Sequence, residues 1–224
     1  GGKKDSSEIE VAEKNICWLK IRTTGKQCHA STPDEGRNPF LANCELALSL
    51  NAMEREVLTD RSPLFSPDRS TITPTKKEAG VPNINTVPGE DVFYLDMRVL
   101  PQYSVERVVA EAAKRMRQVE QKYGVSVQHE IVMKNESPAT PADAPVVGLL
   151  KQAILDTYKV ESRAIGIGGG TVGAYLRQAG YHCVVWSTQD ETMHAPNEYT
   201  KIANIIGDAK VFARLMLGSR TAAR

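Results

Sequence analysis

Two histidines lie in segments that could perform chemistry. His29 stands within Gly25-Lys-Gln-Cys-His-Ala-Ser-Thr-Pro33, and His194 stands within Thr192-Met-His-Ala-Pro-Asn-Glu198. Small residues and prolines surround both, whereas a core histidine would have apolar neighbours at the period of a strand or a helix. Imidazole can donate hydrogen bonds, transfer protons and bind metals. We therefore interpret His29 and His194 as site residues.

A glycine-rich turn, Gly166-Ile-Gly-Gly-Gly-Thr-Val-Gly173, is the third candidate. It lies between a predicted strand and a predicted helix, where backbone N–H groups can hold an anion. Dinucleotide binding is disfavoured because the acidic residues about 20 positions on, Asp190 and Glu191, lie in a loop beside His194. A phosphate-binding P-loop is excluded because no Gly-Lys-Ser/Thr follows. A tight structural turn and a carboxylate-binding turn are the two interpretations that we keep.

Composition excludes several classes of protein. The 28 basic and 27 acidic residues give a formal net charge of +1, which offers no electrostatic reason to expect nucleic acid or a membrane surface as partner. No apolar run approaches the roughly 20 residues that span a bilayer, and the first residues lack the apolar segment of a signal peptide. The four cysteines form no CxxC pair, so we expect reduced thiols and a cytoplasmic protein. Cys28 beside His29 is interpreted as a half-buried thiol, because neighbours in a strand point to opposite faces.

Residues 10–135 are predicted to form one insertion domain of α+β type. The pattern predicts strands 15–24, 70–76, 92–100 and 126–133 and helices 38–56 and 105–123. This β-α-β-β-α-β order is that of a ferredoxin-like domain. The first helix is expected to rest on Phe40, Cys44, Ala47 and Leu48, and the second on Val105, Val108, Val109, Ala112 and Met116. Ser104 and Gly124 are predicted to cap the second helix.

Residues 136–224 follow a proline-rich connection and show a different pattern. They predict helices 146–158, 171–179 and 200–217 and strands 161–167 and 182–187. Helices between short apolar strands indicate an α/β fold with a parallel sheet. Two strands cannot bury both faces of such a sheet, so we expect this block to be part of a larger domain.

Five motifs occur in an order that resembles the M20 family of metallopeptidases, which includes acetylornithine and succinyl-diaminopimelate deacylases. They are the Gly25 to Pro33 segment with Asn38-Pro39, Asn85-Thr-Val-Pro-Gly-Glu90, Asp96-Met-Arg98, Gly168-Gly-Gly-Thr171 and His194-Ala-Pro-Asn-Glu198. The resemblance covers the chain from about Glu10. It implies a ferredoxin-like dimerisation domain followed by the C-terminal α/β portion of a zinc-hydrolase catalytic domain.

The resemblance also implies roles for individual residues. Two zinc ions, with cobalt or manganese as alternatives, would activate water for cleavage of an amide bond in an N-acyl amino acid or a small peptide. His194 would bind zinc, and His29 would stabilise the oxyanion across a homodimer interface. The substrate-binding residues would be Asn85, Arg98, Gly169, Gly170 and Thr171.

One part of the family pattern is missing. The His-x-Asp pair, the bridging Asp, the Glu-Glu pair and one further carboxylate precede the insertion domain in this family, and the sequence has no counterpart of them. His129 and His182 fall on strand patterns and are expected to be structural. We therefore expect this chain alone to be inactive. A noncatalytic dimerisation or ligand-binding module and a nucleotide-binding protein are the alternatives.

Overall fold

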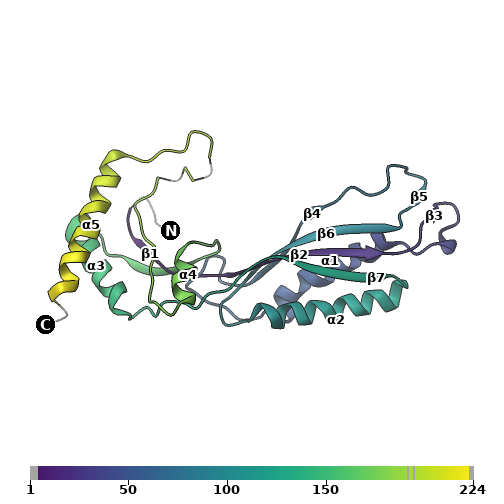
Figure 1. The fold of residues 1–224 in the computed structure, drawn as a ribbon, viewed down its shortest axis with the longest axis horizontal. Helices are drawn as coiled ribbons and strands as arrows, with labels where there is room; N and C mark the ends of the chain where they lie inside the picture. The colour runs from purple at the N-terminus through teal and green to yellow at the C-terminus, as the bar shows by residue number, and fades with distance from the viewer. Residues whose placement is uncertain (1–4, 191, 194, 222–224) are drawn as a thin grey trace. The chain divides into compact units, whose positions relative to one another are not determined.

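The computed structural model describes residues 5–190, 192–193 and 195–221 of a mixed α/β chain (Figure 1). It has two compact units. Unit 1 comprises Gly1–Glu13, Leu64–Ser66 and Ser137–Arg224, and unit 2 comprises Lys14–Pro63 and Pro67–Glu136. Within the described part of the chain, none of the helices combines the length and hydropathy that a bilayer-spanning segment needs.

Unit 2 is built on a four-stranded antiparallel sheet. Its strands, in spatial order, are β4 (Thr71–Lys77), β6 (Glu90–Val99), β2 (Asn15–Thr24) and β7 (Ser126–Asn135). Along β2, Cys17, Leu19 and Ile21 are buried, and the residues between them, such as Trp18, face the open side. All four predicted strands of this unit are present within two residues of their predicted bounds.

Two helices cover the buried face of this sheet (Figure 1). They are α1 (Pro39–Glu56), which packs on β2, β4 and β6, and α2 (Val105–Tyr123), which packs on β2 and β7. Ser104 Oγ accepts a hydrogen bond from the Arg107 N–H at 3.3 Å, and Gly124 ends α2 with a φ of 63°. Both predicted caps are confirmed, and glycine is favoured at the second because its φ is positive.

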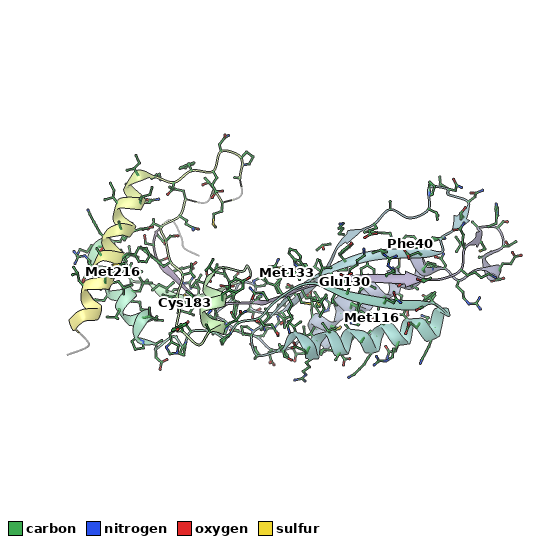
Figure 2. The ribbon with its side chains drawn as sticks, viewed as in Figure 1. Phe40, Met116, Glu130, Met133, Cys183 and Met216 are labelled. Atoms are coloured by element: carbon green, nitrogen blue, oxygen red, sulfur yellow. The ribbon has the colours of Figure 1, made fainter. Side chains whose placement is uncertain are left out.

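The side of α1 that packs on the sheet is not the predicted one. Phe40 is 45% exposed (Figure 2) and Leu48 is 74% exposed, whereas Leu46 and Leu50 are fully buried. The helix carries two apolar stripes, and the stripe that packs inward also buries Asn43, whose Oδ1 accepts a hydrogen bond from the Thr23 hydroxyl at 2.5 Å. On α2 the predicted stripe is buried apart from half-buried Val109.

Unit 1 contains a two-stranded parallel sheet of β1 (Glu8–Glu13) and β8 (Arg163–Ile167). Its helices are α3 (Pro145–Tyr158), α4 (Gly173–Gln178) and α5 (Ile202–Thr221). Helices α3 and α5 pack together, and the buried Trp186 makes edge contacts with Tyr158 and Phe212. Gly166 in β8 must lack a side chain, because a Cβ there would lie 2.3 Å from the Phe65 ring.

The prediction of a strand over residues 182–187 is wrong. Only Val185 is bridged, in antiparallel fashion, to Glu10 of β1. The backbone groups of Cys183 bind the Thr140 hydroxyl, with the Cys183 N–H donating at 3.0 Å and the carbonyl accepting at 2.6 Å, so they cannot continue a strand ladder. The strand that does pair with β8 is β1, which the sequence pattern did not predict.

Candidate functional site

His29 and Asn85 are brought together, although 56 positions separate them, at two short strands that lie beyond one end of the unit 2 sheet (Figure 1 labels the strands). Two short strands, β3 (Cys28–His29) and β5 (Thr86–Val87), pair there in antiparallel register. The Ala30 N–H donates to the Asn85 carbonyl at 2.8 Å, and Asn85 Nδ2 lies 3.5 Å from His29 Nε2. Both side chains are exposed. The long polar loop between β4 and β6 therefore delivers Asn85 to the predicted catalytic histidine.

Hydrogen bonds to one ring nitrogen orient the His29 imidazole. The Ser31 backbone N–H donates to His29 Nδ1 at 3.2 Å, and the Ser31 hydroxyl lies 2.8 Å from the same atom. Because Nδ1 accepts a hydrogen bond from a backbone N–H, a neutral ring carries its proton on Nε2. His29 thus presents its Nε2–H on the side of the ring that faces Asn85. Because Asn85 Nδ2 is itself a donor, the 3.5 Å approach between the two nitrogens is not a hydrogen bond.

Close backbone approaches explain the glycines of the His29 segment. A Cβ at Gly25 would lie 2.1 Å from the Arg37 carbonyl oxygen, and one at Gly36 would lie 2.5 Å from Cys28 Sγ. Lys26 and Arg37 form a bridge with two backbone hydrogen bonds of 2.9 Å. The segment between these glycines is therefore closed into a tight loop, and glycine is required at positions 25 and 36 because a Cβ there would collide with the opposite segment.

Arg98 lies elsewhere on unit 2. Its Nε and Nη2 donate to the two carboxylate oxygens of Asp96, at 2.6 Å and 2.9 Å, and Trp18 Nε1 also donates to Asp96. Arg98 pairs with Ile16 near the first residue of β2, whereas His29 follows the last residue of that strand. At the rise of an antiparallel strand, about 25 Å of β2 separates the two ends. The structure does not bring Arg98 to His29 within one chain.

The glycine turn of unit 1 already holds a carboxylate that belongs to the chain itself. Glu13, the last residue of β1, accepts the Thr171 N–H at 2.9 Å and the Thr171 hydroxyl at 2.5 Å. Arg177 Nη2 donates to the same carboxylate at 2.6 Å. The neighbouring Gly169 and Gly170 are exposed. Thr171 and the two glycines thus lie together, and a buried ion pair anchors the threonine.

Sequence reasoning missed Glu10, Glu13 and Arg177. The Arg177 side chain is 1% exposed and that of Glu13 is 3% exposed, and the Glu10 carboxylate lies 3.9 Å from Arg177 Nη2. Burial raises the pKa of the Glu10 carboxyl to about 7, and the adjacent Glu13 adds to the rise. The sequence signal for this network was the presence of three glutamates in the six residues of β1. Acidic side chains need cationic partners when they are buried.

The predicted metal ligand His194 lies outside the described residues, as does Glu191. Among the residues that the structure describes, no three His, Cys, Asp or Glu side chains are grouped so that they could hold a metal ion. His129 is exposed on β7, and His182 lines an apolar cavity of about 580 Å³ beside Trp186. The described residues therefore do not form a metal site by themselves.

Comparison with known proteins identifies relatives over nearly the whole chain. An uncharacterized metallohydrolase of Methanococcus maripaludis is 35% identical over 96% of this chain and 55% of its own length. Succinyl-diaminopimelate desuccinylase 2 of a Ruegeria species is 23% identical over 93% of this chain and 51% of its own length. The chain thus spans about half the length of the curated relatives that it matches.

Fold comparison agrees with these relatives. A tripeptidase structure from Staphylococcus aureus superposes with a TM-score of 0.75 at 16% identity, and the match covers 93% of this chain and 52% of the tripeptidase. At that identity the match establishes the fold alone. The peptidase dimerisation domain of the M20 family matches residues 11–124, which is more than half of the chain. The chain therefore belongs to the M20 family and contains its peptidase dimerisation domain.

Proposed function

We propose that this chain is the C-terminal part of a metal-dependent hydrolase that cleaves the amide bond of an N-acyl amino acid or a small peptide. Water adds to the amide carbonyl, the C–N bond breaks, and a carboxylic acid and an amine are released. The observation that carries the proposal is that the exposed His29 presents its Nε2–H beside the Nδ2 donor of Asn85, on a loop held by backbone hydrogen bonds. Membership of the M20 family and the names of its hydrolase relatives support the same reaction class.

In this proposal His29 stabilises the oxyanion that forms when water adds to the carbonyl. A donor helps most when it is oriented before the reaction, and the two contacts from Ser31 supply that orientation. Asn85 lies beside the ring and contacts the substrate. Arg98 is the planar donor for a substrate carboxylate, and it has to exchange at least part of its contact with Asp96 to act in this way.

The separation of His29 from Arg98 supports a homodimer. A small acylated amino acid is shorter than the roughly 25 Å of β2 between the two residues, so both can serve one substrate only if they come from different chains. The dimerisation domain fits this arrangement. We propose that His29 and Asn85 act in the site of a partner subunit.

We propose that further ligands of the metal come from sequence outside these 224 residues. We propose zinc as the metal and His194 as one of its ligands. The described residues by themselves form no group that could hold the ion. An intact-mass measurement on the natural protein tests whether further sequence precedes Gly1.

Subunit mixing tests the proposed function on the natural full-length protein. His29→Ala and Arg98→Ala are each expected to lower kcat/KM, the first by about 10²- to 10³-fold. Mixed in equal amounts, they should recover about a quarter of the wild-type activity, because half of the dimers then hold one complete site. No recovery despite proven heterodimers would contradict catalysis in trans. Absence of amide hydrolysis in the wild type, with a dimer still formed, would favour the noncatalytic dimerisation module.

A further inference from the structure

The buried network of unit 1 uses the donors that Thr171 was expected to offer to a substrate. Threonine has one backbone N–H and one hydroxyl proton. Both are directed at Glu13, at 2.9 Å and 2.5 Å, and the hydroxyl oxygen also accepts the Gly173 N–H at 3.1 Å. Thr171 can bind a substrate carboxylate only by giving up a contact with the Glu13 carboxylate.

Arg177 makes that exchange unfavourable. Its Nη2 donates to Glu13 at 2.6 Å and its Nη1 to the carbonyl of Cys183 at 3.3 Å (Figure 2 labels Cys183). Both side chains of the ion pair are almost fully buried. A carboxylate that is shielded from water and held by a cation depends on each of its remaining donors, because no water replaces a lost one. Glu13 therefore holds Thr171 firmly in place.

Gly173, two residues after Thr171, is also tightly packed against neighbouring side chains. A Cβ at this position would lie 2.8 Å from Val185 Cγ2 and 3.2 Å from Arg177 Nη1. The first residue of α4 is thus packed against the guanidinium that holds Glu13. Gly169 and Gly170, on the other side of Thr171, are exposed.

We propose that Glu13 is a positioning residue: by fixing Thr171 it sets the exposed backbone of Gly169 and Gly170 as the place where the substrate carboxylate binds. Glu13 then acts through Thr171, and neither side chain touches the substrate. This inference rests on the proposed function in one respect, namely that the substrate carries a carboxylate.

A double-mutant cycle tests the coupling without any activity measurement. Glu13→Gln, Thr171→Val and the double variant are made in the 224-residue chain, with Glu8→Gln as matched control, since Glu8 lies on the same strand and is paired with Arg163 at 2.7 Å. Unfolding in urea is followed by Trp186 fluorescence in a Trp18→Phe background. The double variant should lose no more stability than the less stable of the two single variants. Thr171→Ser, which keeps the hydroxyl, should unfold at the same urea concentration as the wild type. Additive losses would overturn the proposal.

Kinetics on the natural full-length protein test the positioning role. For an N-acyl amino acid, Glu13→Gln and Thr171→Val should each raise KM about ten- to hundredfold, with no rise for the matching carboxamide substrate. A lower KM in Glu13→Gln together with a higher KM in Thr171→Val would show direct substrate contact by Thr171. Lower stability with an unchanged KM would reduce Glu13 to a structural residue. A wild type that hydrolyses neither substrate would contradict the proposed function. The double-mutant cycle in urea would still test the contact between Glu13 and Thr171.

Discussion

The two candidate regions differ in what holds their key side chains. At the end of unit 2, the exposed His29 and Asn85 are placed by backbone hydrogen bonds of short strands, and their side chains contribute little to the core. In unit 1, Thr171 is placed by a buried ion pair whose members lie on β1 and α4. Substitutions at the first region should therefore change chemistry alone. At the second, stability and function depend on the same contacts.

The largest effect is expected from Arg177→Met in unit 1. It leaves the Glu13 carboxylate buried without its cation, and breaking a buried pair in this way costs about 3–5 kcal/mol. The free energy of unfolding is measured in urea through Trp186 fluorescence in a Trp18→Phe background. The double variant Glu13→Gln/Arg177→Met should recover part of the loss, because the Glu13 charge is then no longer buried without a cation.

Arg98→Met is the matched control for this comparison. Arg98 also binds a carboxylate, in this case with two nitrogens, but both side chains of its pair with Asp96 are about one quarter exposed. Water can replace the lost contacts there, so the loss should stay within about 1 kcal/mol when unfolding is followed by circular dichroism. Equal losses in the two variants would contradict the assignment of the Arg177 pair as a buried network.

An intermediate effect, on the stability of unit 1, is expected from pH. Burial raises the pKa of Glu10 from its ordinary 4.5 to about 7, so the folded state binds more protons than the unfolded state between these values. This stabilisation is complete below pH 4.5 and is lost as the pH rises through about 7. The free energy of unfolding reported by Trp186 should fall by roughly 1–3 kcal/mol between pH 5 and pH 8.

Glu10→Gln should remove most of this pH dependence, because an amide does not titrate in the range. Glu130→Gln, at an exposed glutamate of β7 (Figure 2), should leave it intact. If the free energy of unfolding still falls with pH in Glu10→Gln, another group is responsible for the titration.

The two units also differ in how much of their structure the sequence predicts. Strands and helices of unit 2 bury one face each, so the alternation around Leu19 and the stripe of Val108, Ala112 and Met116 are readable as periods of 2 and 3.6. The stripe of α1 was misassigned because that helix has apolar residues on two sides, and only the packing decides between them.

In unit 1 the decisive contacts are not periodic. All six residues of β1 are buried, so the alternation of its glutamates with Ile9 and Val11 does not mark an exposed face. The segment around Val185 has strand-like residues, but the backbone of Cys183 binds a side chain instead. The turn at Thr171 was recognised as a carboxylate-binding candidate from its glycines and its place before a helix. That Glu13 supplies a carboxylate depends on a contact across 158 positions of sequence, which local patterns do not encode.

The smallest effect on stability is expected at the exposed end of unit 2. Ser31→Ala removes the hydroxyl 2.8 Å from His29 Nδ1 and keeps the backbone N–H that donates to the same atom. The free energy of unfolding should change by no more than about 0.5 kcal/mol, as for surface substitutions that disturb no core contact. The neutral ring should keep its proton on Nε2, which ¹⁵N chemical shifts of the imidazole report directly. If the proton moved to Nδ1, the serine hydroxyl and not the backbone would set the tautomer, and the orientation of the proposed oxyanion donor would depend on a single exposed side chain. Retention of the Nε2 proton at unchanged stability would show that this region can be tuned chemically without disturbing the fold, in contrast to the turn at Thr171.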